Sequence, residues 1–381
     1  MAVLLAVLVI LSVFLAGYVL GLVRARDPNL GLVREALAAM NTYSLDPLPD
    51  ELRLERSMIH AAIGALNDPF SVYVEPAQHE LQADDLAGEF GGIGALLTID
   101  EDGRVLITPL AKGPAQVAGI QPGSVLVSVD RVQVPLFPSL PDLIASLRGP
   151  EGTKVHLVIR GSDEVGGTLE YTLTRERFDI PSVSAFLSPL DPALGVIKLV
   201  RFAETSPAEL EAGYDSLRDQ GIQALVLDLR DNGGGLLDST VSIASFFLPS
   251  GIVLKEERVD HQQKEYRVEK PGRATDLPLA IFINENTASA AEVLAAALRE
   301  NRRALLIGSQ TFGKGTVQAV VELSDGSSLH ITTARWLTPE GKTLDGTGLV
   351  PDYPLESGSE SGPDPYLTLA QHLLLHESVG P

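Results

Sequence analysis

LAIFINENTASAAEVLAAALRENRRALLIGSQTFGKGTVQAVVEL occupies residues 279–323 and decides the class of fold. It begins with an apolar run of strand length and continues through an alanine- and leucine-rich run of helix length. Two further apolar runs follow, separated by a glycine-containing loop. We predict strand, helix, strand, loop and strand in that order. Alternation of this kind builds a sheet that is covered by helices.

The same alternation extends upstream and defines a core over residues 176–356. LGVIKLV and ALVLDL predict buried strands, whereas SPAELEAGYDSLRDQG and LDSTVSIASFFL predict helices, the first with a proline just inside its start. Residues 87–175 change character: short β-rich runs alternate with glycine- and proline-containing turns, which predicts a small β domain. The fold class is therefore α/β plus β.

The two ends of the chain predict smaller parts. Helix-like spacing in residues 32–40 and 51–66 predicts a helical module over residues 24–86. Residues 357–381 begin as a linker rich in serine, glycine and proline and end in a short amphipathic helix.

Residues 2–23 contain no charged side chain. They are long enough for a helix across a bilayer, which takes about 20 residues. The run is long for a cleaved signal peptide and no small-x-small site follows it, so we predict a membrane anchor over residues 1–23. Arg24 and Arg26 follow the span, and the positive-inside tendency alone would place the body in the cytoplasm.

Composition excludes several classes of function. The chain of 381 residues has 50 acidic and 29 basic side chains, a net charge of -21, which argues against binding to nucleic acid or tightly to an anionic membrane surface. It contains no cysteine, so disulfides, Cys-based zinc sites and a thiol nucleophile are excluded. Hydrophobic residues make up 45% of the chain, enough for a sizeable core.

Ser289 and Lys314 are the candidate reacting groups. Ser289 stands where a strand ends and a helix begins, and with Glu292 it also forms the sequence of a capping box, the common structural reading. Lys314 lies on the loop after the next strand, between Gly313 and Gly315. Most lysines are solvated surface groups, but a buried lysine loses its charge more easily and can then take a proton from a serine. We expect the amine and the hydroxyl to lie within hydrogen-bonding reach of each other.

DLRDNGGGLL, residues 228–237, is the candidate oxyanion site. Three glycines at the end of a strand allow backbone N–H groups to converge on an anion. An ordinary strand-to-helix turn is the alternative reading, although such a turn needs only one or two glycines.

GSQTFGKGT, residues 308–316, nearly matches the phosphate loop of nucleotide hydrolases. Gly315 stands where that loop needs a hydroxyl for Mg²⁺, and a strand rather than a helix follows. The acidic strand also precedes the loop instead of following it. We therefore expect no nucleotide.

Four blocks together resemble the carboxyl-terminal processing proteases, the PDZ-containing, tail-specific serine endopeptidases of bacteria and plastids. In chain order they are LNDPFSVYVEP, FGGIGALL with AGIQPGSVLVSVD, LVLDLRDNGGGLLD, and NTASAAEVLAAAL with GSQTFGKGTVQ. The resemblance covers about residues 32–354. It implies a crotonase/ClpP-like spiral for the protease core and a PDZ-like domain over residues 87–175.

The resemblance also implies roles. Ser289 would be the nucleophile, Lys314 its general base and Gln318 the residue that positions the lysine. The oxyanion hole would come from the backbone N–H of Ala290 and of Gly234 or Gly235. Two departures occur: Gly233 replaces the usual proline of the glycine loop, and Ala291 replaces a second serine. Neither removes a reacting group, although glycine for proline loosens the loop.

The PDZ-like domain would select substrates. Backbone N–H groups of Gly91, Gly92, Ile93 and Gly94 would bind a free C-terminal carboxylate, and the peptide would add as a strand beside IGALL. A tight turn is the structural alternative for these glycines. Arg148 is a candidate bridge to the protease body, although a solvated surface arginine is the common case.

The expected partners are proteins with accessible, unfolded C-terminal tails, and no metal or other cofactor is expected. The resemblance places the body outside the cytoplasmic membrane, in the periplasm or cell envelope, against the weak charge signal at the anchor. The oligomeric state, including a homodimer, stays open. Two other functions remain: a PDZ scaffold with an inactive protease body, and an acyl-CoA enzyme on the same spiral fold, which has no need of a PDZ domain.

Overall fold

The computed structural model describes residues 30–161, 167–355 and 363–376. Its contacts divide the chain into two compact units, Met1–Ala62 and Ile63–Pro381. The helices α2 (Gly31–Tyr43) and α3 (Glu51–Gly64) have the positions that the apolar spacing predicts. Neither of these two helices, both within the described residues, contains a buried side chain.

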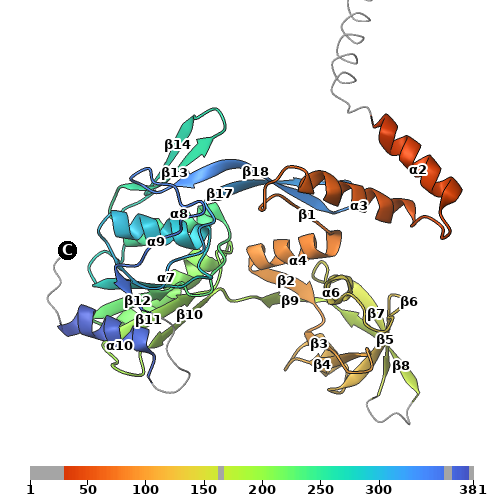
Figure 1. The fold of residues 1–381 in the computed structure, drawn as a ribbon. Coiled ribbons are helices and arrows are strands. Elements are labelled where there is room, and N and C mark those ends of the chain that lie inside the picture. Colours follow the sequence, from red (N-terminus) through yellow and green to blue (C-terminus); the bar gives the residue numbers. More distant parts are fainter. Residues whose placement is uncertain (1–29, 162–166, 356–362, 377–381) are drawn as a thin grey trace, which may run out of the picture. The chain divides into compact units, whose positions relative to one another are not determined.

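One six-stranded sheet of the second unit has the strand order β10-β11-β12-β15-β16-β19. These strands are β10 (Val183–Leu187), β11 (Leu194–Leu199), β12 (Ala224–Asp228), β15 (Leu279–Ile283), β16 (Leu305–Gly308) and β19 (Tyr353–Pro354). β10 is antiparallel to β11, and the remaining neighbours are parallel. The helices between and after them are α7 (Ser206–Asp219), α8 (Leu237–Phe247) and α9 (Ala290–Glu300). This is the alternation that the sequence predicts (Figure 1).

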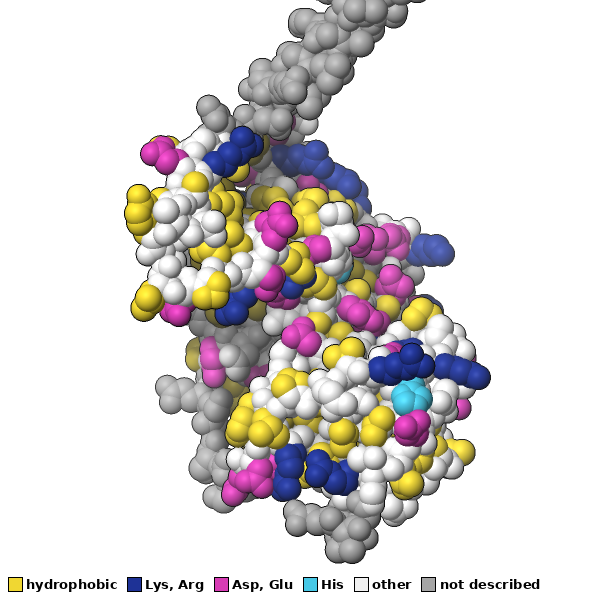
Figure 2. All heavy atoms as spheres, turned by 90° about the vertical axis from the view of Figure 1, so that its right-hand side faces the viewer, with side chains coloured by type: hydrophobic (Ala, Val, Ile, Leu, Met, Phe, Trp, Pro, Cys, Tyr) yellow, Lys and Arg dark blue, Asp and Glu magenta, His cyan; other side chains and the backbone are white. Residues whose placement is uncertain are grey.

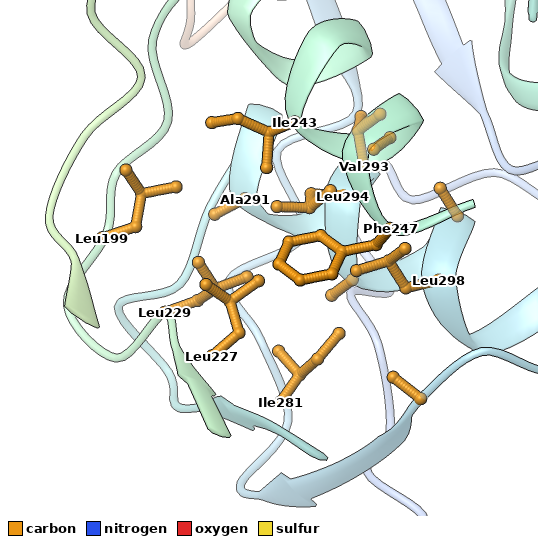
Figure 3. Close-up of a cluster of buried hydrophobic side chains, with 14 of the residues drawn as sticks. Leu199, Leu227, Leu229, Ile243, Phe247, Ile281, Ala291, Val293, Leu294 and Leu298 are labelled. Carbon is orange, nitrogen blue, oxygen red and sulfur yellow. The ribbon is translucent and has the colours of Figure 1, made fainter. Parts of the chain in front are cut away.

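Side chains alternate between the two faces of this sheet, as the strand period requires. On β12, Leu225 and Leu227 join the hydrophobic cluster of α7, α8 and α9, whereas Ala224 and Val226 join a second cluster. Figure 3 shows part of the first cluster, in which side chains from strands and helices gather around the ring of Phe247: Leu199, Leu227, Ile243, Ile281, Leu294 and Leu298. Ser289 therefore directly precedes a helix, α9, whose residues 290–298 are all buried.

The second cluster is closed by α10 (Pro365–Gln371) and a short π-helix (His372–His376). Tyr366 is 2% exposed, and its ring packs edge-to-face on Phe282 of β15 with the centroids 5.3 Å apart. The sequence assigned this helix to a tail beyond a linker. The structure makes it a layer of the core, because its apolar side chains cover the sheet face that α7–α9 leave open.

A second sheet surrounds β18 (Ser328–Leu337). Its order is β1-β18-β13-β14, and β17 also pairs with β18. The other strands are β1 (Val72–Val74), β13 (Ile252–Arg258), β14 (Gln263–Arg267) and β17 (Thr316–Glu322). β1 lies in residues that the sequence assigned to the helical module, yet Val72 pairs with His330 in β18. Residues 63–74 thus end in a strand of the sheet around β18, and α4 (Pro76–Ala87) follows them.

Residues 93–174 form a β-rich body with its own hydrophobic cluster, centred on side chains such as Ile107 and Leu157. The sheet order is β3-β4-β5-β7-β8, with β6 beside β5. Its elements are β3 (Ala95–Ile99), β4 (Val105–Pro109), α5 (Pro114–Val117), β5 (Ser124–Val129), β6 (Val132–Gln133), α6 (Leu140–Leu147), β7 (Lys154–Arg160) and β8 (Thr168–Thr174). Before and after this body, β2 (Glu89–Gly92) and β9 (Glu176–Asp179) pair with each other.

The predicted anchor, residues 1–23, lies outside the described residues. Among the helices that the structure describes, none is long and apolar enough to cross a membrane. On the face drawn in Figure 2, acidic, basic and hydrophobic side chains are interspersed, without a continuous basic patch on that face.

Candidate active site

Ser289 immediately precedes α9 and has a strained backbone. Its φ of 54° and ψ of -120° lie outside the regions that a residue with a side chain ordinarily occupies. Such strain costs about 1–3 kcal/mol and persists only where the surroundings impose it. Its side chain is half-buried. A sharp strand-to-helix turn of this kind presents a hydroxyl at the end of a sheet.

Glu292 holds the turn in place. Its Oε2 accepts the Ser289 N–H at 2.9 Å, the carboxyl half of the predicted capping box. The same oxygen accepts the Lys314 N–H at 2.9 Å, while Oε1 accepts the Gly313 N–H at 2.8 Å and the Thr311 hydroxyl. The Glu292 side chain is fully buried. One carboxyl group therefore fixes the serine turn and the lysine loop relative to each other, a role that the capping-box reading alone did not include.

Lys314 is half-buried, and its Nζ donates a hydrogen bond to Gln318 Oε1 at 3.2 Å. Burial lowers the pKa of the Lys314 amine, and the negative charge of Asp68 partly opposes this effect. The amine lies 5.5 Å from the centre of the Phe70 ring. A lysine in these surroundings releases its proton more readily than one in water.

The side chains of Ser289 and Lys314, both among the described residues, make no hydrogen bond with each other in this structure, and the lysine amine donates to Gln318. The sequence led us to expect the two groups within hydrogen-bonding reach. Their backbones are joined through Glu292, but the long, flexible lysine side chain turns toward Gln318.

The glycine loop lies against the serine. A Cβ atom on Gly234 would sit 2.9 Å from the Ser289 Cβ and 3.1 Å from the Ala290 nitrogen, so a side chain has no room there. Gly234 also has a φ of 106°, which favours glycine. The structure thus brings Gly234 to Ser289 and Ala290, whereas Gly235, the next residue of the loop, lies against the backbone of Phe202.

The two candidate oxyanion donors of this loop differ. The Gly234 N–H donates to Asn232 Oδ1 at 2.8 Å, whereas the Gly235 N–H makes no hydrogen bond with any described residue. The Ala290 N–H lies in the first turn of α9, where backbone donors have no partner within the helix. Of these two candidates, Gly235 is the one whose donor has no partner among the described residues.

Asn232 is a site residue that the sequence reading did not single out. Its side chain is fully buried, donates to the Leu199 carbonyl at 2.8 Å and accepts the Gly234 N–H. Its backbone carbonyl accepts the Ala288 N–H at 2.9 Å. It joins the glycine loop, β11 and the serine turn. The only sequence signal was its place directly before the three glycines.

A pocket of about 710 Å³ opens beside the lysine loop. The turn that contains Asp68 and Phe70 lines one part of it, and Phe312, Gly313 and Thr316 line another. The Phe312 side chain is 60% exposed. Of the lysine loop, Gly313 lines the pocket, directly before Lys314 in the chain.

The four residues predicted to bind a peptide carboxylate have different surroundings. Gly91 and Gly92 lie in β2 and pair with β9. Ile93 is buried in the cluster of the β-rich body, and its carbonyl accepts the Ala115 N–H at 2.9 Å. Gly94 directly precedes β3, an edge strand that pairs with β4 only among the described strands. The free edge of β3 is the position where a peptide strand can add.

Arg148 ends α6 and binds α4. Its guanidinium pairs with Asp84 at 2.9 Å and stacks on the Phe90 ring, 4.1 Å from its centre. The predicted bridge from the β-rich body therefore reaches α4, the helix that follows β1, and not the sheet that carries Ser289.

Comparison with known sequences agrees with this architecture. Residues 193–355 match peptidase family S41, and residues 107–161 match the PDZ domain. Carboxyl-terminal-processing peptidase 2 (chloroplastic) of Arabidopsis thaliana is 36% identical over 310 residues, which cover 78% of this chain and 59% of that protein. The carboxyl-terminal-processing protease of Synechocystis sp. is 35% identical over 303 residues, 78% of this chain and 70% of that protein.

Carboxy-terminal processing protease CtpA of Bacillus subtilis is 33% identical over 308 residues, 81% of this chain and 65% of that protein. The chain thus spans between 59% and 70% of the length of these three relatives. The match to family S41 covers the sheet from β11 to β19, the glycine loop, the serine turn and the lysine loop, and the PDZ match lies in the β-rich body. The chain belongs to the carboxyl-terminal processing serine proteases of peptidase family S41.

Proposed function

We propose that this chain is a serine endopeptidase that cleaves proteins near their C-terminal tails through an acyl-enzyme on Ser289. The main support for this proposal is the buried carboxyl group of Glu292, which binds the backbone N–H groups of both Ser289 and Lys314. It keeps a strained serine and a lysine with a lowered pKa on adjacent loops. A nucleophile and a base held in this way have the arrangement that acyl transfer needs.

In the first step the neutral Lys314 amine takes the Ser289 proton as Oγ attacks the carbonyl carbon of the scissile bond. For this, the lysine side chain turns from Gln318 toward the serine, a rotation about single bonds that leaves the backbone bonds to Glu292 intact. Gln318 positions the amine between turnovers. Catalytic hydrogen bonds often form only once substrate is bound.

The tetrahedral oxyanion would lie between the N–H groups of Ala290 and Gly235. The start of α9 contributes its positive dipole end to the same place. Collapse breaks the C–N bond, and the leaving amine takes the proton from the Lys314 ammonium. Water then attacks the ester, again with Lys314 as the base, and releases the second product and Ser289.

The PDZ domain would select the substrate. We propose that a C-terminal tail adds along the free edge of β3, with its carboxylate near Gly94. Gly91 and Gly92, which pair with β9, shape the start of this loop.

The direct experiment is digestion of an unfolded reporter protein with an apolar C-terminus. We expect the wild-type chain to cleave it and Ser289→Ala and Lys314→Ala to be inactive. The same reporter with an amidated C-terminus should be cleaved more slowly. Equal inactivity of the wild type across several reporters would favour a PDZ scaffold with an inactive protease body.

We also propose that residues 1–23 tether the protease to a membrane with its body on the extracytoplasmic side. The support is the uncharged stretch of residues 2–23, which is long enough to cross a bilayer as a helix. Full-length protein should remain with membranes after alkaline carbonate extraction, and added protease should degrade the body in spheroplasts. A body protected in intact spheroplasts would contradict the orientation.

A further inference from the structure

The turn formed by residues 68–71 (DPFS) lies against the lysine, although the catalytic roles above do not use it. Asp68 Oδ1 accepts the Phe70 N–H at 3.1 Å, and Oδ2 accepts the Ser71 hydroxyl. These are the bonds of a closed Asx turn. Burial raises the pKa of Asp68, but the hydrogen bonds from Ser71 and Phe70 outweigh it and hold that pKa below its usual value. The turn is therefore closed around a carboxylate.

This turn is fixed to the strand that faces Gln318. The buried Ser71 hydroxyl accepts the Thr332 N–H of β18 at 3.1 Å. Thr332 is the cross-strand partner of Gln318, and the β17–β18 ladder is irregular between Val317 and Gln318. A bulge re-aims the side chain beside it. Here the extra residue is Thr333 of β18, which directly follows Thr332, the residue that binds the turn and pairs with Gln318.

Phe70 makes two contacts with the candidate catalytic residues. Its carbonyl accepts a hydrogen bond from Gln318 Nε2, and its ring centre lies 5.5 Å from Lys314 Nζ. A backbone carbonyl can only accept, so the amide nitrogen of Gln318 must face Phe70. Oε1 then faces Lys314, where it accepts the amine at 3.2 Å. Phe70 thus fixes which end of Gln318 meets the base.

We infer that Phe70 is a positioning residue of the catalytic site, which orients Gln318 through its carbonyl and shields the Lys314 amine from water with its ring. This inference rests on the proposed function of Lys314 as the general base. It assigns a role to LNDPFSVYVEP, the motif that the catalytic roles left without one.

The charges around the amine determine the expected effects. Burial lowers the pKa of Lys314, and Asp68 is the acidic side chain that opposes this. His330 of β18 faces the same amine; burial lowers its pKa, and the positive charges of His79 and Lys314 add to that effect. Glu292 binds Lys314 through the backbone N–H of that residue and not through its side-chain amine. Removing the Phe70 ring should therefore raise the pKa of Lys314, whereas removing the negative charge of Asp68 should lower it.

The experiment is the pH profile of kcat/KM for cleavage of the unfolded reporter. Phe70→Ala should move the acid limb to higher pH, and each pH unit of displacement lowers kcat/KM on that limb about tenfold. Phe70→Leu, which keeps an apolar cover, should restore most of the wild-type limb. Asp68→Asn, which can keep the Asx turn but loses the charge, should move the limb to lower pH. Leu66→Ala, an exposed neighbour of the turn, should leave the limb in place.

Phe70→Ala with the wild-type limb would overturn the inference. Asp68→Asn with a limb that does not move to lower pH would refute the opposing effect of the Asp68 charge. If Phe70→Ala does not fold, Phe70→Thr, which also removes the ring, takes its place, and a wild-type limb in that variant would overturn the inference. Cleavage that survives in Lys314→Ala would instead refute the proposed base. If Ser289→Ala and Lys314→Ala are inactive but the acid limb does not move in the Phe70 and Asp68 variants, only the role of the turn is refuted.

Discussion

The carboxyl group of Glu292 accepts the backbone N–H of Lys314 at 2.9 Å, although a helix, a strand and two loops separate the two residues in the chain. The same oxygen accepts the Ser289 N–H. Because the side chain is fully buried, these bonds do not compete with water. The distance between the nucleophile's turn and the base's loop is therefore set by one residue that reacts with nothing.

Glu292→Gln tests this connection. The amide nitrogen of glutamine would face backbone N–H donors, which leaves at least one buried donor unpaired and costs about 1–3 kcal/mol. We expect a lower midpoint of thermal unfolding and a loss of kcat of at least tenfold. Glu285→Gln, on the exposed loop before Ser289, is the matched control and should change neither. Wild-type kcat in Glu292→Gln would show that the connection is dispensable.

Gly234→Ala tests the contact of the glycine loop with the nucleophile. The new Cβ would lie 2.9 Å from the Ser289 Cβ, which must displace either the serine or the loop. This displacement would move Ser289 or the neighbouring Gly235 N–H out of place, and because an oxyanion donor is worth about 10²–10³ in rate, a loss of kcat approaching that size is expected. Gly233→Ala is the control in the same loop, because its Cβ would meet nothing within 4 Å. Similar kcat values for the two variants would contradict the proposed oxyanion site.

The pH dependence of cleavage follows from the lowered pKa of Lys314. Only the neutral amine can accept the serine proton, so kcat/KM should rise with pH through that pKa and reach half its plateau below 10.4, the usual value for lysine. Lys314→Arg keeps the charge but cannot lose its proton near neutral pH, and it should be inactive. A profile that falls with pH over this limb would exclude a lysine base.

The same shift affects stability. Between the folded and the unfolded pKa of Lys314, the unfolded chain binds more protons, so the free energy of unfolding should rise with pH across this window. Urea unfolding of wild type and Lys314→Met at a series of pH values measures the difference. An equal slope in both chains would mean that Lys314 is not the titrating group.

Much of the core and the placement of the candidate site could be predicted from the sequence. Strand–helix alternation put Ser289 and Lys314 after neighbouring strands, β15 and β16, whose ends meet at one edge of a parallel sheet. Local patterns also gave the glycine loop. Each of these features depends on residues close together in the chain, where periodicity and turn residues carry the information.

The remaining contacts depend on pairing over long separations. Phe70 meets Gln318 because β1 and β17 both pair with β18, and no local pattern specifies which distant strands pair. The capping-box pattern was enough to explain a glutamate at position 292, so the sequence did not predict its hydrogen bonds to the lysine loop. The predicted hydrogen bond between the serine and the lysine depends on one rotatable side chain, which in this structure binds Gln318.

Tyr366→Ala tests the place of α10 in the core. The ring is 2% exposed and packs on Phe282, so its removal should cost about 3–5 kcal/mol in the free energy of unfolding, as for other buried aromatic residues. Thr368→Ala, on the exposed side of the same helix, should change it by less than about 0.5 kcal/mol. Chemical denaturation of both variants decides whether the C-terminal helix is a core layer or an appended tail.

The most direct measurement is the intact mass of the protein after reaction with a fluorophosphonate that modifies activated serines, followed by peptide mapping of the adduct. We predict one adduct on the wild-type chain, located on Ser289, none on Ser289→Ala, and labelling of Lys314→Ala that is slower by at least tenfold. An adduct on another serine, or equal labelling rates with and without Lys314, would contradict the proposal that this lysine activates Ser289.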